Sequence, residues 1–397
     1  MKERPASLLA WIYVGSLAIV LGISLLSATP SPQDDHFLYQ RFIESLAGGR
    51  LDLSIPGFHG SDLFGFIIYV FTRSPIAQIY GLFIAAALLP LAGFLAGRSI
   101  FKEDWHGIVL ASIVALMPFI SFVSLRGWTG PGYWLLMLLT IWSATTKRWW
   151  LTGILFALAI LTKPFAIVLL PLLFVLNPSK EKNWERHRAV FMGGAIVALY
   201  LLIQYVQAGR IFVGAHADLS EAGALQGPTR ILLNIAHGLQ ILFSVHNYYY
   251  PNPALTGPGN MMHTTPVIVF LGLFAMLAPD TAGADRRLMR SLLLGAIIGI
   301  GMNALLDHMD HFYMEASILL FTIAALPMLR RFPLWIPIVL ATLHFQWFYF
   351  YLQYRPGFLL DWRFILVPGF VDFMLIEWCV TRQGQVRRIL SAVLTGR

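Results

Sequence analysis

The chain has 397 residues, of which 57% are apolar and only 12% are charged. Soluble domains carry about 25% charged residues, so this composition excludes an ordinary soluble protein and predicts a helical bundle in lipid. The net charge is +8, but the basic residues stand in short clusters between apolar runs. That arrangement indicates membrane topology and not a nucleic-acid partner. The single cysteine, Cys379, excludes an internal disulfide or a multi-cysteine metal site.

About a dozen apolar runs follow one another along the chain, each as long as a membrane-spanning helix or somewhat shorter. They cover residues 8–28, 76–97, 106–125, 131–146, 149–176, 189–208, 229–245, 264–279, 290–306, 316–329, 333–353 and 362–380. The first run is longer than the apolar core of a signal peptide, so we interpret it as a retained span. The runs predict an all-α polytopic membrane protein, with residues 1–397 in a single transmembrane domain of about 11–12 segments.

Clusters of lysine and arginine predict the orientation of these spans. The clusters are Lys2/Arg4, Arg98/Lys102, Lys147/Arg148, 180–188, 286–290, 330–331 and 382–397. All of them lie on the cytoplasmic side if 149–176 crosses twice and 229–245 does not cross. Pro164 predicts a break in the first of these runs, because proline disfavours helix just before it and removes a donor.

Two long loops, 29–75 and 209–263, are then external. The second contains the non-spanning run. In the first, residues 35–46 place apolar side chains at helical spacing and 62–71 are strongly apolar. Both segments are predicted to form amphipathic helices at the membrane interface.

An acidic pair, Asp34 and Asp35, follows the first span, where Pro30 and Pro32 end the helix. Adjacent carboxylates repel each other, so one of them could have the raised pKa that a general base needs near neutral pH. Alternatively, one of them caps the helix that is expected to begin near His36. The residues alone leave both roles open.

Several cations could bind a phosphate. Lys163 lies between two apolar runs, where an ionisable side chain is either functional or snorkels to the interface. Arg126 stands in a short external loop, and Arg355 and Arg363 flank the last run, where an interface anchor is the alternative.

Other polar and aromatic side chains on the external side could contact a sugar or an acceptor. They are His59, Asp62, Tyr248, His308, Asp310, His311 and Tyr313. The alternatives are a turn with a helix cap for the first two, an aromatic belt for Tyr248 and a solvated loop for the stretch 307–315. The spacing in 307–315 allows a divalent metal but matches no established ligand pattern, so no cofactor is assigned.

Residues 34–50 read Asp-Asp-His-Phe-Leu-Tyr-Gln-Arg-Phe-Ile-Glu-Ser-Leu-Ala-Gly-Gly-Arg. This segment resembles the start of GT-C glycosyltransferases, which include the protein O-mannosyltransferases and the aminoarabinose transferases of lipid A. Residues 160–171 are similar to a recurring mid-chain segment of the same enzymes. The sequence departs from the pattern at 58–62, where many relatives carry a Lys/His-Pro-Pro motif, and at 126–131, where some carry a second acid.

The resemblance implies a GT-C-like bundle in the inner membrane, with its active site facing the periplasm or exterior. It implies a polyprenyl-phosphate sugar as donor, a membrane lipid partner, and a glycan, lipid or protein as acceptor. Asp34 or Asp35 would be the base, with Lys163, Arg126 or Arg355 on the phosphate. The alternative function is a transporter or flippase of lipid-linked sugars, for which inverted repeats and polar residues at mid-membrane would be expected.

Overall fold

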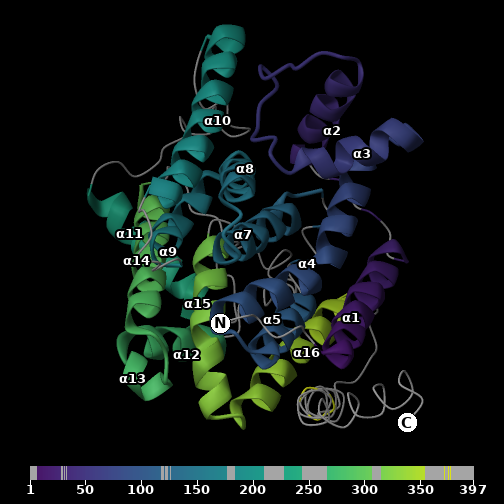
Figure 1. The fold of residues 1–397 in the computed structure, drawn as a ribbon. Coiled ribbons are helices and arrows are strands. Elements are labelled where there is room, and N and C mark those ends of the chain that lie inside the picture. Colours follow the sequence, from purple (N-terminus) through teal and green to yellow (C-terminus); the bar gives the residue numbers. More distant parts are fainter. Residues whose placement is uncertain are drawn as a thin grey trace, which may run out of the picture.

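The computed structural model describes residues 7–27, 34–117, 127–176, 184–209, 228–243, 266–305 and 314–353, with a few isolated positions besides. Within these ranges every regular element is a helix (Figure 1). The helices are α1 (Leu8–Leu26), α2 (Asp34–Ala47), α3 (Asp62–Thr72), α4 (Ala77–Phe101), α5 (Asp104–Leu116), α7 (Gly130–Thr145), α8 (Trp149–Ile160), the 3-10 helix η1 (Pro164–Leu169), α9 (Leu170–Val175), α10 (Trp184–Ala208), α11 (Pro228–Phe243), α12 (Pro266–Leu277), α13 (Pro279–Ala282), α14 (Arg286–Ala304), α15 (Glu315–Arg331) and α16 (Trp335–Gln353). The all-α prediction is confirmed for the described chain.

Most of the predicted apolar runs coincide with these helices, and both predicted amphipathic segments of the first loop are helical, as α2 and α3. The run 106–125 is an exception. Helix α5 ends at Leu116, and Met117 is already extended, because Pro118 disfavours helix at the residue before it. The run 362–380 lies almost entirely outside the described residues.

Four of the described helices are long and apolar enough to cross a membrane: α1, α4, residues 187–208 of α10, and α14. Six shorter apolar helical segments of 10–17 residues accompany them. The described chain is therefore an all-helical protein with helices suited to a membrane. Whether the shorter helices also cross, and whether α11 does not, stay predictions.

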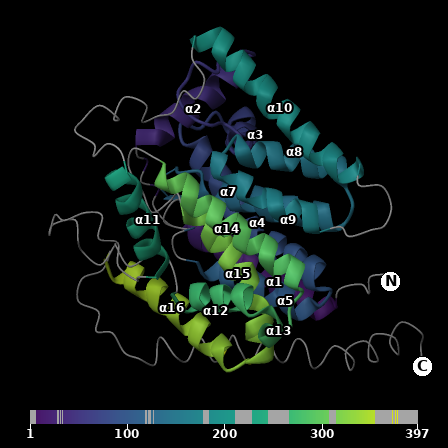
Figure 2. The same ribbon diagram turned by 90° about the vertical axis from the view of Figure 1, so that its left-hand side faces the viewer.

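Helix α4 is the centre of the amino-terminal half, because α1, α3, α5 and α7 all pack against it. In the other half, α12 and α14 pack against α15, and α8 packs against α10. Helices α2 and α3 lie together at one end of the bundle, beside the beginning of α4 (Figures 1 and 2). The core between the helices is a continuous cluster of buried apolar side chains.

Glycine permits the closest of these helix contacts. At the crossing of α3 and α4, a Cβ atom on Gly81 would overlap the backbone of Gly65. Small residues at a crossing let two backbones approach, which is the usual way that helices associate in lipid. The first-loop helices are therefore held to the bundle by a backbone contact as well as by side chains.

We expect Gly81→Ala to destabilise the protein by about 1–3 kcal/mol, because the added methyl group overpacks the crossing. Gly15→Ala is the matched control, since Gly15 lies within α1 and a Cβ there would meet nothing within 4 Å. Alanine favours the helix over glycine, so the control should keep or raise the unfolding temperature. Thermal unfolding in detergent measures both variants, and equal midpoints would contradict the tight crossing.

Candidate functional site

The amino-terminal end of α7 is the place where most of the described candidate residues meet. Gly127 has a positive φ of 81°, and a Cβ on it would lie only 2.8 Å from the Cβ of His36 in α2. Five residues farther on, Gly132 packs in the same way against Ser61, just before α3. One residue later, the ring of Tyr133 faces Lys163. The acidic end of α2, the start of α3 and the break after α8 therefore surround one helix end.

The predicted break within 149–176 is confirmed. Helix α8 ends at Ile160, Lys163 is extended with φ −148° and ψ 125°, and the 3-10 helix begins at Pro164. The Lys163 side chain points inward and is only 16% exposed. The depth of Lys163 in a membrane stays a prediction.

Lys163 forms an ion pair with Glu315, the first residue of α15. The Lys163 Nζ atom donates to Glu315 Oε2 at 2.8 Å, and it lies 5.7 Å from the centre of the Tyr133 ring. The Glu315 side chain is 3% exposed. Removing either partner would leave an uncompensated charge inside the bundle, which is strongly unfavourable. A lysine ammonium has three donors, so the group at this site could bind an anion in addition to Glu315.

His59 and Asp62 form a second buried pair. The His59 Nδ1 atom lies 2.7 Å from Asp62 Oδ2, and Gln78 Nε2 donates to Asp62 Oδ1 at 2.9 Å. The His59 ring also stacks on Phe42, with ring centres 3.8 Å apart. Burial raises the pKa of Asp62, while its hydrogen bonds with His59 and Gln78 oppose the rise.

These contacts join the loop before α3 to α2 and α4. Asp62 begins α3, but its side chain is engaged by His59 and Gln78 and makes no cap to the helix. The expected helix cap at Asp62 is therefore wrong. A sugar contact by either side chain stays a prediction, and it would require these internal bonds to rearrange.

The same loop also contacts the helix break. The Gly60 amide donates to the Leu161 carbonyl at 2.8 Å, and a Cβ on Gly60 would overlap the Leu158 carbonyl oxygen. The loop between α2 and α3 thus rests directly on the segment that presents Lys163.

Helix α2 begins at Asp34, which is two residues earlier than expected. Asp35 consequently lies in the first turn, where a carboxylate interacts favourably with the helix dipole, and its side chain is partly buried. One alternative was that Asp35 caps a helix beginning near His36. This is wrong, because Asp35 lies inside α2. The role of either carboxylate as a base stays a prediction.

Several predicted site residues lie outside the described part of the chain. They are Arg126, Arg355, Arg363, Tyr248, His308, Asp310, His311 and Tyr313. Their proposed contacts stay predictions. Within the described ranges, no group of three or more His, Cys, Asp or Glu side chains could hold a metal ion.

Sequence reasoning did not assign roles to Tyr133 or Gln78, and it considered Glu315 only as part of the stretch 307–315. The solvated-loop alternative for that stretch is wrong for Glu315, whose side chain is 3% exposed at the start of α15. Glu315 gave a usable signal, because it is an acid directly before the apolar run 316–329, and such an acid needs a cation. Tyr133 and Gln78 lie inside apolar helices and gave no comparable signal.

Comparison with protein-family models and with curated proteins finds no match to this chain. The likeness to GT-C enzymes therefore rests on residues 34–50 and 160–171 of the sequence alone.

We expect acidification to destabilise the folded protein through His36, a buried residue of α2. Burial lowers the pKa of His36, and the Pro75 backbone and the Glu44 carboxylate oppose this only partly. The folded state therefore binds fewer protons than the unfolded state below about pH 6.5, and stability falls as the pH drops through that range.

The unfolding temperature of wild type should fall more between pH 7.5 and 5.5 than that of His36→Gln, which cannot titrate. Thermal unfolding of both proteins at the two pH values measures the difference. Parallel pH profiles would show that His36 is not a buried neutral imidazole in the folded protein.

Proposed function

We propose that this protein is an integral membrane glycosyltransferase of the GT-C type. It would move a sugar from a polyprenyl-phosphate donor to a glycan, lipid or protein acceptor at the periplasmic or exterior face. The observation that supports this best is the meeting of the acidic helix α2 and the Lys163–Glu315 pair at one end of α7.

The proposed threading places every basic cluster in the cytoplasm. Basic residues stand at the carboxyl ends of α4, α7 and α15 and at the amino ends of α8 and α14. In Figure 2, α10, α14 and α16 slant in the same sense, as three outward-running helices would. Helices α2 and α11 lie toward one end of these three helices, and α13 lies toward the other end.

The chemistry would be a single displacement. A carboxylate of the acidic pair takes the proton from the acceptor hydroxyl, whose oxygen forms a bond to the anomeric carbon. The bond between that carbon and the phosphate oxygen breaks, and the electron pair leaves on the phosphate, so the anomeric centre inverts. The leaving phosphate needs positive charge rather than a proton, and Lys163 would supply it.

Glu315 would position this cation. Its carboxylate accepts a hydrogen bond from the Lys163 ammonium at 2.8 Å and so fixes where the positive charge lies. We propose that the donor headgroup binds beside the break between α8 and the 3-10 helix, where the Lys163 backbone is extended.

A transporter of lipid-linked sugars is the second candidate, and the same ion pair favours it. Charged pairs inside an apolar bundle also occur in relays and substrate pathways of transporters. The two candidates differ in whether a carboxylate must take the proton of an acceptor hydroxyl while a glycosidic bond forms.

Replacing the base with asparagine should abolish transfer without unfolding the protein. Asparagine and aspartate cap a helix about equally well, whereas a general base contributes about 10²–10⁴-fold in rate. We therefore expect one of Asp34→Asn and Asp35→Asn to lose transfer by that factor. Mass spectrometry of lipid-linked sugars and envelope glycans, in a deletion strain complemented with each variant, should show the donor accumulating.

Asp52→Asn is the matched control for that experiment. Asp52 lies in the same loop and accepts hydrogen bonds from Ser54, so its variant should transfer normally. Near-normal transfer by both Asp34→Asn and Asp35→Asn would make the pair structural and favour the transporter.

The ion pair can be tested separately for stability and for function. Lys163→Met alone should cost about 3–5 kcal/mol, because it leaves Glu315 buried without its cation. The double variant Lys163→Met/Glu315→Leu removes both charges and should recover most of that loss. We expect the double variant to unfold near the wild-type temperature and still fail to transfer sugar. Wild-type transfer by the double variant would show that the pair only stabilises the fold.

A further inference from the structure

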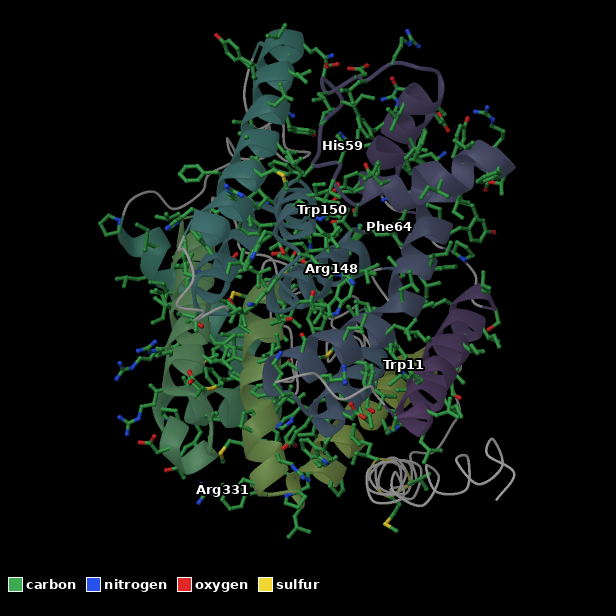
Figure 3. All side chains as sticks on the ribbon, in the orientation of Figure 1. Trp11, His59, Phe64, Arg148, Trp150 and Arg331 are labelled. Atoms are coloured by element: carbon green, nitrogen blue, oxygen red, sulfur yellow. The ribbon has the colours of Figure 1, made fainter. Side chains whose placement is uncertain are left out.

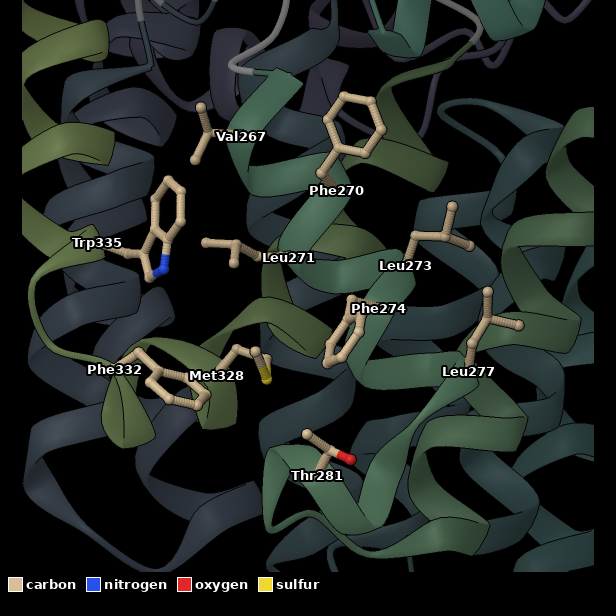
Figure 4. Close-up of a pocket in the computed structure, with 10 residues that line it drawn as sticks. All are labelled: Val267, Phe270, Leu271, Leu273, Phe274, Leu277, Thr281, Met328, Phe332 and Trp335. Carbon is tan, nitrogen blue, oxygen red and sulfur yellow. The ribbon is translucent and has the colours of Figure 1, made fainter.

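An apolar groove of about 640 Å³ lies far from the site described above, between α12 and the junction of α15 and α16 (Figure 4). Helix α12 supplies Phe270, Leu273 and Phe274 to one wall. Met328, Phe332 and Trp335 supply the facing wall. Its lining is almost wholly hydrocarbon, so the groove suits an apolar chain and not a sugar.

The groove opens outward from the bundle. Phe270 is 58% exposed, Phe274 is 46% exposed and Phe332 is 42% exposed. An exposed apolar surface of this kind marks a membrane or partner contact. Here it flanks α14, a helix apolar and long enough to cross a membrane.

One end of the groove carries the cation Arg331, for which the described residues supply no balancing carboxylate. Arg331 donates to the backbone carbonyls of Asp280 and Thr281, and Thr281 is itself part of the groove lining. The guanidinium lies 5.8 Å from the centre of the Phe332 ring. No carboxylate of the described residues lies within ion-pair distance of Arg331, and its side chain is exposed. Figure 3 shows it at the end of the molecule opposite His59.

The surrounding charges add to this positive end. Arg286 is paired with Asp280, and Arg330 lies 3.5 Å from Glu103. Asp285 caps α14 through the Leu288 amide. Arg287 and Arg290 are exposed on the first turns of α14. Among these described residues five arginines outnumber three carboxylates, so the chain around the α13–α14 and α15–α16 junctions carries net positive charge.

We propose that this groove holds an acyl chain of an anionic phospholipid whose phosphate contacts Arg331. The apolar walls match a hydrocarbon chain, and basic pockets between membrane helices attract anionic headgroups. Trp335 also lines the groove, and tryptophan is enriched at membrane interfaces. A second copy of this chain would bring the same arginines against one another, which disfavours it as the occupant. The inference does not depend on glycosyl transfer.

Native mass spectrometry of the detergent-solubilised full chain tests the proposal with two probes, phosphatidylglycerol and phosphatidylcholine with identical acyl chains. Wild type should retain phosphatidylglycerol in preference. Arg331→Gln should bind phosphatidylglycerol about fivefold more weakly, the change expected for one basic residue at a membrane surface. Leu273→Trp, which fills the groove, should weaken the binding of both lipids.

Two controls match these variants. Lys147→Gln removes an exposed cation at the end of α7, and Leu294→Trp changes an exposed leucine on α14 outside the groove lining. Neither should alter lipid retention. Equal retention of the two lipids, or an unchanged affinity in Arg331→Gln, would overturn the proposal. A dimer that disappears in Leu273→Trp would overturn it in favour of a second copy.

Discussion

The ion pair between Lys163 and Glu315 is the interaction on which the candidate site depends, because it connects segments that are otherwise only packed together. The two residues are 152 positions apart in sequence, and they bring the break after α8 to the first turn of α15. Tyr133 places α7 at the same point. In an apolar bundle each of these charges would be strongly unfavourable alone. The pair therefore constrains which helix ends can meet, as well as stabilising their contact.

A second polar network holds the first loop in place. Gln40 of α2 donates to the Ser74 carbonyl and accepts from the Gln78 amide, while Gln78 donates to Asp62. One amide side chain thus ties α2 to the start of α4, and the next ties α4 to α3. These hydrogen bonds hold α2, which carries Asp34 and Asp35, and the start of α3 against α4.

The helices were predictable because apolar runs of the right length have few other stable structures in lipid. Pro164 predicted the break after α8, and Pro118 could have predicted the early end of α5. The partners were not predictable. Nothing near Lys163 in sequence points to Glu315, and the contact of Gly60 with Leu161 joins two segments a hundred residues apart. The spacing of His59 and Asp62 is compatible with a hydrogen-bonded pair of side chains. The sequence does not show whether such a pair is buried, and in the structure both side chains are.

The helix break and the first loop are coupled through the backbone. A break in a membrane helix leaves amide and carbonyl groups that must find partners within the protein. The Lys163 amide still donates to the Ala159 carbonyl, and the Lys163 carbonyl accepts from the Ala166 amide. The Leu161 carbonyl receives its donor from Gly60, in the loop that also carries His59 and Asp62. If that loop moved away, Leu161 would lose its partner next to the lysine. The acidic pair and the cation therefore belong to one connected unit, in which displacement of the loop must disturb the position of Lys163.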